Sequence, residues 1–102
     1  MTDNVELPST IEESLEILLE DLSLTEKKEI AELAKNDLSG LHFSLGQFIR
    51  NKFELWEDNN ELTKFCCKTS GTKEMHPDSV SSMIIKALWQ RLQVLNKIRI
   101  IN

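Results

Sequence analysis

The stretch L-S-G-L-H-F-S-L-G-Q-F-I-R-N-K-F, residues 38–53, decides how this chain is expected to fold. Its apolar residues recur in steps of three and four, which is the spacing of one face of an α-helix. They are Leu38, Leu41, Leu45, Phe48, Ile49 and Phe53. We therefore expect one central, heavily buried helix over 38–53. Because Gly46 lies inside it and glycine weakens a helix, we expect another helix to cross closely at that point.

The sequence before this stretch predicts two more helices. Ser9 and Glu12 have the spacing of a capping box, in which side chains and backbone amides of the first turn satisfy one another, ahead of a helix over about 10–22. Ser23 or Thr25 repeats that signal for a second, shorter helix. Because the connection between them is short, we expect the two helices to pack as an antiparallel pair.

The residues that follow position 53 predict a loop, a short helix and a second loop. The segment 54–60 is typical of a loop, and Asn59 or Asn60 is placed to cap a short helix that runs through Cys67. The segment 68–75 has the serine, glycine and threonine content of an exposed, mobile loop.

The last long helix is predicted to open at Pro77, because the missing N–H of proline is not needed in the first turn. Apolar spacing extends the helix over 78–95, where it packs against 38–53, and the apolar tail 98–101 either lengthens it or pairs as a short strand. Three glycines and two prolines are too few for an all-β fold with many tight turns. With 102 residues the chain fits one domain, 1–102, which we expect to be an all-α, compact bundle of four to five helices.

The net charge of −5 is unevenly spread along the chain. Residues 1–36 hold ten acids and three bases, whereas residues 37–102 hold seven acids and nine bases. Basic residues this sparse do not form the clustered patch that nucleic acid requires, so nucleic acid is disfavoured as a partner. The first predicted helix carries the densest acidic cluster: Glu12, Glu13, Glu16, Glu20 and Asp21. We expect these acids to face a basic surface of another protein, as in inhibitors and immunity proteins, and the chain to be a non-catalytic interaction module.

Cys66 and Cys67 are the only cysteines, and adjacent cysteines rarely reach disulfide geometry without strain. We expect one to be buried and the other exposed. A zinc site formed by them with His42 and His76 is disfavoured, because zinc ligands are usually spaced two to four residues apart. A Cys–His pair without a glycine elbow or phosphate loop gives little support to catalysis. We therefore expect no metal and no cofactor.

The opening residues contain neither a positive start nor an apolar run, so a signal peptide is not expected. The chain has no apolar stretch of the length that spans a membrane. These features favour a cytoplasmic protein without a membrane partner.

Several motifs resemble those of a small bacterial family of domains of unknown function. They are L-P-x-T-x-E-E-x-L-x-x-L-L over 7–19, L-H-F-x-L-G-x-x-I-R-N-x-F-x-L-W over 41–56, H-P-D at 76–78 and I-I-x-x-L-W at 84–89. The resemblance implies a compact helical domain and brings no established activity with it. The chain departs from the family pattern over 64–75.

The polar residues inside these motifs are the candidate site. They are His42, Arg50, Asn51, His76 and Asp78. One interpretation is a small cleft for an anionic or amide-bearing ligand, with Arg50 and Asn51 as donors, in a ligand-binding domain or minor enzyme. The other, which we favour, is a structural clamp in which Arg50 pairs with Asp78 while His76 caps its own helix.

The two tryptophans also allow two interpretations. Trp56 and Trp89 could be anchors that face a partner, because tryptophan is enriched at binding hot spots. Packing in the core against Phe48 and Phe53 is favoured, because large aromatic side chains supply much of the burial of a small core.

Overall fold

The computed structural model describes residues 7–101, with side chains described as far as Leu95. The described residues form six helical segments and no strand. They are α1 (Ile11–Asp21), α2 (Leu24–Ala31), the 3-10 helix η1 (Lys35–Leu41), α3 (Leu45–Lys52), α4 (Glu61–Ser70) and α5 (Pro77–Ile101). The all-α class is confirmed, although the count of four to five helices was low. Residues 1–6, on which the expected absence of a signal peptide rested, lie outside the described part.

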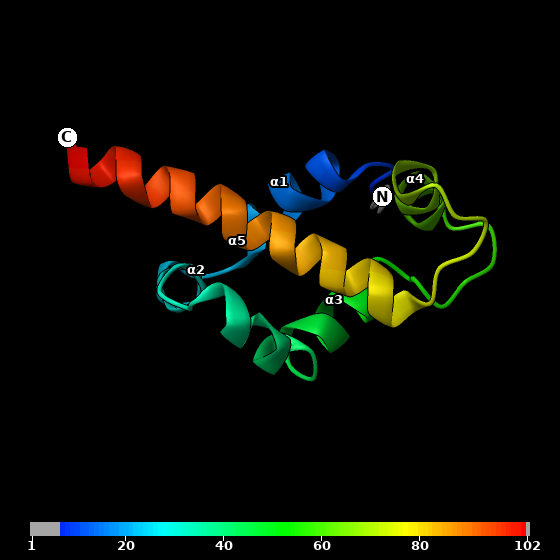
Figure 1. The fold of residues 1–102 in the computed structure, drawn as a ribbon, viewed down its shortest axis with the longest axis horizontal. Coiled ribbons are helices and arrows are strands. Elements are labelled where there is room, and N and C mark those ends of the chain that lie inside the picture. Colours follow the sequence, from blue (N-terminus) through cyan, green and yellow to red (C-terminus); the bar gives the residue numbers. More distant parts are fainter. Residues whose placement is uncertain (1–6, 102) are drawn as a thin grey trace, which may run out of the picture.

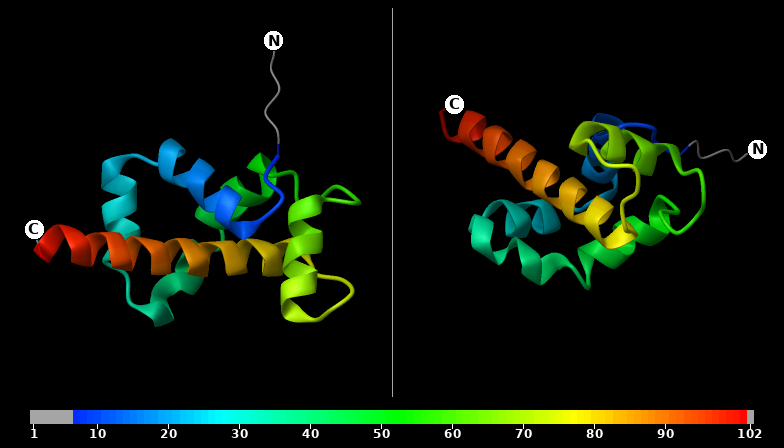
Figure 2. Two further views of the ribbon diagram at one scale, coloured as in Figure 1. Left: turned by 90° about the horizontal axis from the view of Figure 1, so that it is seen from above. Right: turned by 45° about the vertical axis from the view of Figure 1, so that its right-hand side comes forward.

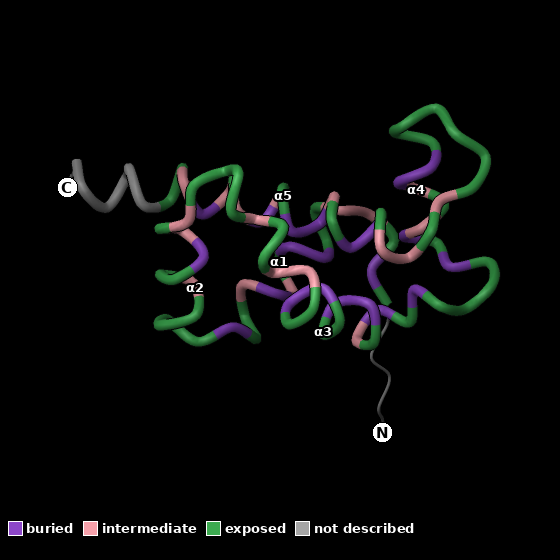
Figure 3. Tube along the Cα trace, turned by 60° about the horizontal axis from the view of Figure 1, so that its bottom comes forward, coloured by how far each residue is buried: buried purple, intermediate pink, exposed green. Residues whose placement is uncertain are grey.

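The helix α5 is the axis of the fold, and the other five segments pack against it (Figures 1 and 2). Figure 3 shows buried and exposed stretches alternating along most helices, as expected when each helix buries one face. The core joins residues from both ends of the chain, including Leu18, Ile49, Phe53, Ile84 and Leu88. Within the part of the chain that is described, no helix is long and apolar enough to cross a membrane.

The prediction of one helix over 38–53 is wrong. The segment divides into η1 and α3, and residues 42–44 between them form a bend. In a continuous helix the carbonyl of His42 would accept the amide of Gly46. At the bend this carbonyl instead accepts a hydrogen bond from Arg50 Nη2 at 3.3 Å. Phe48, which the periodicity placed in the core, is 43% exposed.

The helix starts follow local capping chemistry closely. The N-cap of α1 is Thr10, whose side chain accepts the amide of Glu13, one residue later than the predicted box of Ser9 and Glu12. The N-cap of α2 is Ser23, and its reciprocal capping box is complete. The predicted pairing of α1 with α2 is wrong, because two extended residues between them turn α2 steeply away, so that each helix packs on α5 (Figure 2).

The helix α4 begins after the predicted cap Asn60, whose side chain accepts the amide of Thr63 at 2.9 Å. It continues to Ser70 and ends at Gly71, which has a φ of 73°. Residues 68–70 are therefore helical, in contrast to the predicted loop, and only the part beyond Gly71 is a loop, whose mobility stays a prediction. The helix α5 starts at Pro77 and continues through the tail, so the helical alternative for 98–101 is confirmed.

Two predictions about burial need correction. Cys66 and Cys67 are both buried, whereas one was expected to be exposed. Trp56 was expected in the core and is 57% exposed, because it lies on the loop between α3 and α4. Trp89 does pack against the core, and its Nε1 donates a hydrogen bond of 2.9 Å to the carbonyl of Leu33.

Candidate functional site

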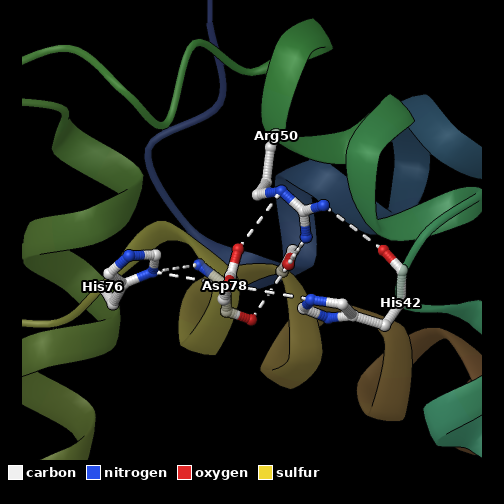
Figure 4. Close-up of polar contacts among 5 residues, drawn as sticks. His42, Arg50, His76 and Asp78 are labelled. Atoms are coloured by element: carbon white, nitrogen blue, oxygen red, sulfur yellow. Dashed lines mark hydrogen bonds and ion pairs between the residues drawn. The ribbon is translucent and has the colours of Figure 1, made fainter.

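The side chain of Arg50 extends from α3 to the first turns of α5, where it is almost fully buried (Figure 4). Its Nη1 donates to Ser81 Oγ at 2.9 Å, and Ser81 Oγ in turn donates to the backbone carbonyl of Asp78 at 3.0 Å. Its Nη2 donates to the carbonyl of His42. The guanidinium therefore joins the η1–α3 bend to the start of α5.

The charge of this buried guanidinium is balanced by Asp78. Among the described buried side-chain nitrogen and oxygen atoms, only Arg50 Nε lacks a hydrogen bond, and Asp78 Oδ1 lies 3.5 Å from it. Asp78 belongs to the first turn of α5, where a carboxylate is also favoured by the helix dipole. We call Arg50, Asp78, Ser81 and the His42 carbonyl the clamp.

The two histidines flank the carboxylate of the clamp. His42 Nε2 and His76 Nδ1 each lie 3.7 Å from Asp78 Oδ2. His76 Nδ1 also accepts the backbone amide of Asp78 at 3.0 Å, so His76 caps the helix that follows it.

The role of Gly46 differs from the one predicted from sequence. A Cβ at this position would lie 2.9 Å from Arg50 Nη1, whereas the nearest backbone atom outside its own helix, the carbonyl oxygen of Leu41, would lie 3.6 Å away. Glycine is therefore needed to make room for the guanidinium rather than for a crossing helix.

Four of the five candidate site residues thus lie together, and the fifth does not join them. Asn51 is exposed, and its side chain forms no hydrogen bond with the other four. His42, Arg50, His76 and Asp78 do not line either of two cavities, one formed by α1, α2, η1 and α3 and the other beside α4. Chemically, the arrangement can fix the start of α5 against α3. Within residues 7–101, no group of three or more potential ligands could hold a metal ion.

The buried cysteines have an ordinary structural setting. Burial, and secondarily the neighbouring Cys67, raises the pKa of the Cys66 thiol to about 11. A thiol of this kind stays protonated and is a poor nucleophile near neutral pH.

A different feature, which the sequence analysis missed, is an apolar groove formed by α1, α2, η1 and α3. Its volume is about 500 Å³. Apolar side chains line it: Leu22, Ile30, Leu33, Leu41, Leu45 and Phe48. Three carboxylates share the lining, from Asp21, Glu26 and Glu29, with Ser44 as its remaining member. We call this feature the acidic groove. Its signal in the sequence was the pair of acids Glu26 and Glu29 close to the apolar Ile30 and Leu33.

The predicted acidic face of α1 is partly occupied by contacts within the chain. Glu12 forms an ion pair with Arg91, and Asp21 forms one with Lys52. Glu13 accepts the amide of Ser9 at 2.7 Å. The other two acids of the cluster, Glu16 and Glu20, are exposed. The acids of α1 are therefore less available to a partner than their number suggests.

A second cavity, of about 620 Å³, lies beside α4 and its flanking loops. Trp56 contributes to its lining together with three lysines and three acids. Because these charges balance, the cavity has no net charge that would select a ligand.

The fold and the clamp define a small all-helical domain whose charged cluster is used in its own architecture. The model of a domain of unknown function, DUF6794, matches residues 7–92, and the chain belongs to this family. No curated protein and no solved structure matches the chain.

Proposed function

We propose that this chain is a non-catalytic protein-interaction module that binds a basic, amphipathic segment of another protein in the acidic groove. The observation that carries the proposal is an apolar lining that bears the exposed carboxylate of Glu29. The two other carboxylates of the lining also have contacts within the chain, since Asp21 pairs with Lys52 and Glu26 accepts the amide of Ser23. Helix-in-groove recognition uses apolar anchors of the ligand, while charges beside the groove select its sign and steer its approach.

The exposure of Phe48 supports this assignment. A large aromatic side chain that is 43% exposed in a groove is a typical anchor for a bound segment. The partner is therefore expected to present leucine- or isoleucine-like side chains with lysine or arginine beside them. Inhibitors and immunity proteins are one class of module with this design.

The alternative function is a small-ligand site or minor enzyme at His42, Arg50, His76 and Asp78. It has less support, because the polar atoms of Arg50 already face Ser81, the His42 carbonyl and Asp78. Neither described cavity opens onto these residues.

The setting is part of the proposal. The family resemblance favours a bacterial protein, and two buried free cysteines fit the reducing environment of a cytoplasm.

A synthetic amphipathic helix of leucine and lysine, labelled with a fluorophore, tests the proposal by anisotropy at low salt. The variant Glu29→Lys changes an exposed acid of the groove, and Glu20→Lys makes the same change on α1 outside it. We expect Glu29→Lys to weaken binding about tenfold and Glu20→Lys about twofold at most, because only nearby charges escape screening. Equal effects of the two variants would contradict binding in the groove.

A further inference from the structure

We propose that the occupant of the acidic groove is the C-terminal end of α5 from a second copy of this chain, in a reciprocal exchange that forms a dimer. The inference rests on the proposed function, because it names the partner of the same groove. Three features carry it: the projection of α5, its sequence, and the location of the groove.

The C-terminal end of α5 projects beyond the rest of the fold (Figures 1 and 2). Gln93 Nε2 donates a hydrogen bond of 2.6 Å to the carbonyl of Ala31, which fixes α5 to α2. Directly after this contact, Val94 is 56% exposed and Leu95 is 40% exposed. The helix continues to Ile101, so its last eight residues extend about 12 Å. An isolated helix end of this length is marginal in water, and packing against a partner would stabilise it.

The sequence of this end complements the acidic groove. Val94 and Leu95 are followed by Ile98 and Ile101, at the spacing that places apolar residues on one helical face. Lys97 and Arg99 lie between them, and the chain has no acid after Asp78. The end of α5 is thus a basic, apolar helix, and the groove is apolar with three carboxylates. Asp21 is paired with Lys52 and Glu26 caps α2, so Glu29 is the carboxylate that we assign to the bases of the helix end. The segregation of acids into the first third of the chain and bases into its end favours contact between copies.

The contact must be made between two copies. The helix α5 contains no proline or glycine after Pro77, so it has no kink at which its end could fold back onto its own molecule. The helix α2, which forms one wall of the groove, also packs against α5 just before its projecting end, 94–101. The groove and the projecting end of α5 therefore both lie next to α2. Two copies related by a twofold axis can then each place a helix end in the acidic groove of the other.

Sedimentation velocity of the full chain at about 100 µM and low salt tests the inference, because a complex with micromolar affinity is then mostly assembled. We expect a dimer, and a monomer for a chain that ends after Leu95. A monomeric full chain, or larger open assemblies in place of a dimer, would overturn the reciprocal exchange.

Charge reversal supplies the sharper test. Glu29→Lys alone, or Lys97→Glu with Arg99→Glu, should each weaken dimerisation at least tenfold, whereas all three together should restore it. Lys86→Glu, an exposed position in the body of α5, is the matched control and should leave the dimer intact. Absence of rescue in the combined variant would overturn the assignment of the helix end to the groove.

The chain that ends after Leu95 separates this inference from the proposed function. If this shortened chain binds the leucine–lysine peptide while the full chain is monomeric, the groove is an interaction site and only self-association is refuted. If the shortened, folded chain does not bind the peptide and the full chain is monomeric, both proposals are refuted.

Discussion

Replacing Asp78 by Asn tests whether the clamp stabilises the fold. The substitution keeps the shape of the side chain and removes the carboxylate that balances the buried charge of Arg50. After it, the guanidinium keeps only neutral partners, the hydroxyl of Ser81 and the carbonyl of His42. A buried cation without a counter-charge is costly, so we expect a substantial loss of stability.

The magnitude follows from the 3.5 Å between Arg50 Nε and Asp78 Oδ1. Coulomb's law gives about 5 kcal/mol at an effective dielectric constant of 20 and about 1 kcal/mol in water. Asp78 is 44% exposed while Arg50 is buried, so the environment lies between these limits and water partly solvates the carboxylate. We expect the free energy of unfolding to fall by about 2 kcal/mol, which lowers the melting temperature by roughly 10 °C in a domain of this size.

Urea denaturation followed by circular dichroism measures this loss. Glu61→Gln is a matched control, because Glu61 also lies in the first turn of a helix but pairs with an exposed lysine, Lys64. Removal of the helix-dipole interaction and of that exposed pair should cost only about 0.5 kcal/mol. If Asp78→Asn cost no more than the control, the reasoning that the clamp holds α5 against α3 would be refuted.

Three further outcomes follow from the geometry. Gly46→Ala should destabilise the protein by about 1 kcal/mol in urea denaturation, because displacing the clamped guanidinium costs more free energy than the higher helix propensity of alanine gains. Gly40→Ala should be nearly neutral, because nothing lies within 4 Å of a Cβ at that position. Equal effects of the two variants would contradict this account. Stability should fall by about 2 kcal/mol as pH rises from 9 to 11, because burial raises the pKa of the Cys66 thiol from 9.0 in the unfolded chain to about 11 in the folded protein. Urea midpoints at the two pH values should differ less in Cys66→Ala, and an unchanged difference would assign the loss to other groups. Trp89→Phe should lower the free energy of unfolding by about 1 kcal/mol, measured by thermal melting, because it removes the hydrogen bond to the carbonyl of Leu33. Trp56→Phe should lower it much less, because that ring is exposed. The reverse order would contradict the observed packing.

The amino-acid sequence by itself determined the helical class and most helix starts. Ser23, Asn60 and Pro77 open helices where their side-chain chemistry predicts, because a cap depends on backbone groups only three or four residues away. The uneven distribution of charge is likewise a property of the chain alone. The pairing of Arg50 with Asp78 was also among the interpretations that the motifs allowed, although Ser81 as a partner was not.

Only the tertiary structure decided which apolar positions are buried and which segments meet. The periodicity over 38–53 is compatible with one helix. The chain instead bends at 42–44, where the carbonyl of His42 accepts a hydrogen bond from Arg50, a contact that a straight helix would not allow. The acidic groove likewise exists only once α2 has turned towards α5 and left Phe48 without a covering helix. Capping energies act within one turn of chain, whereas these features depend on contacts between residues far apart in sequence, and no local pattern records them.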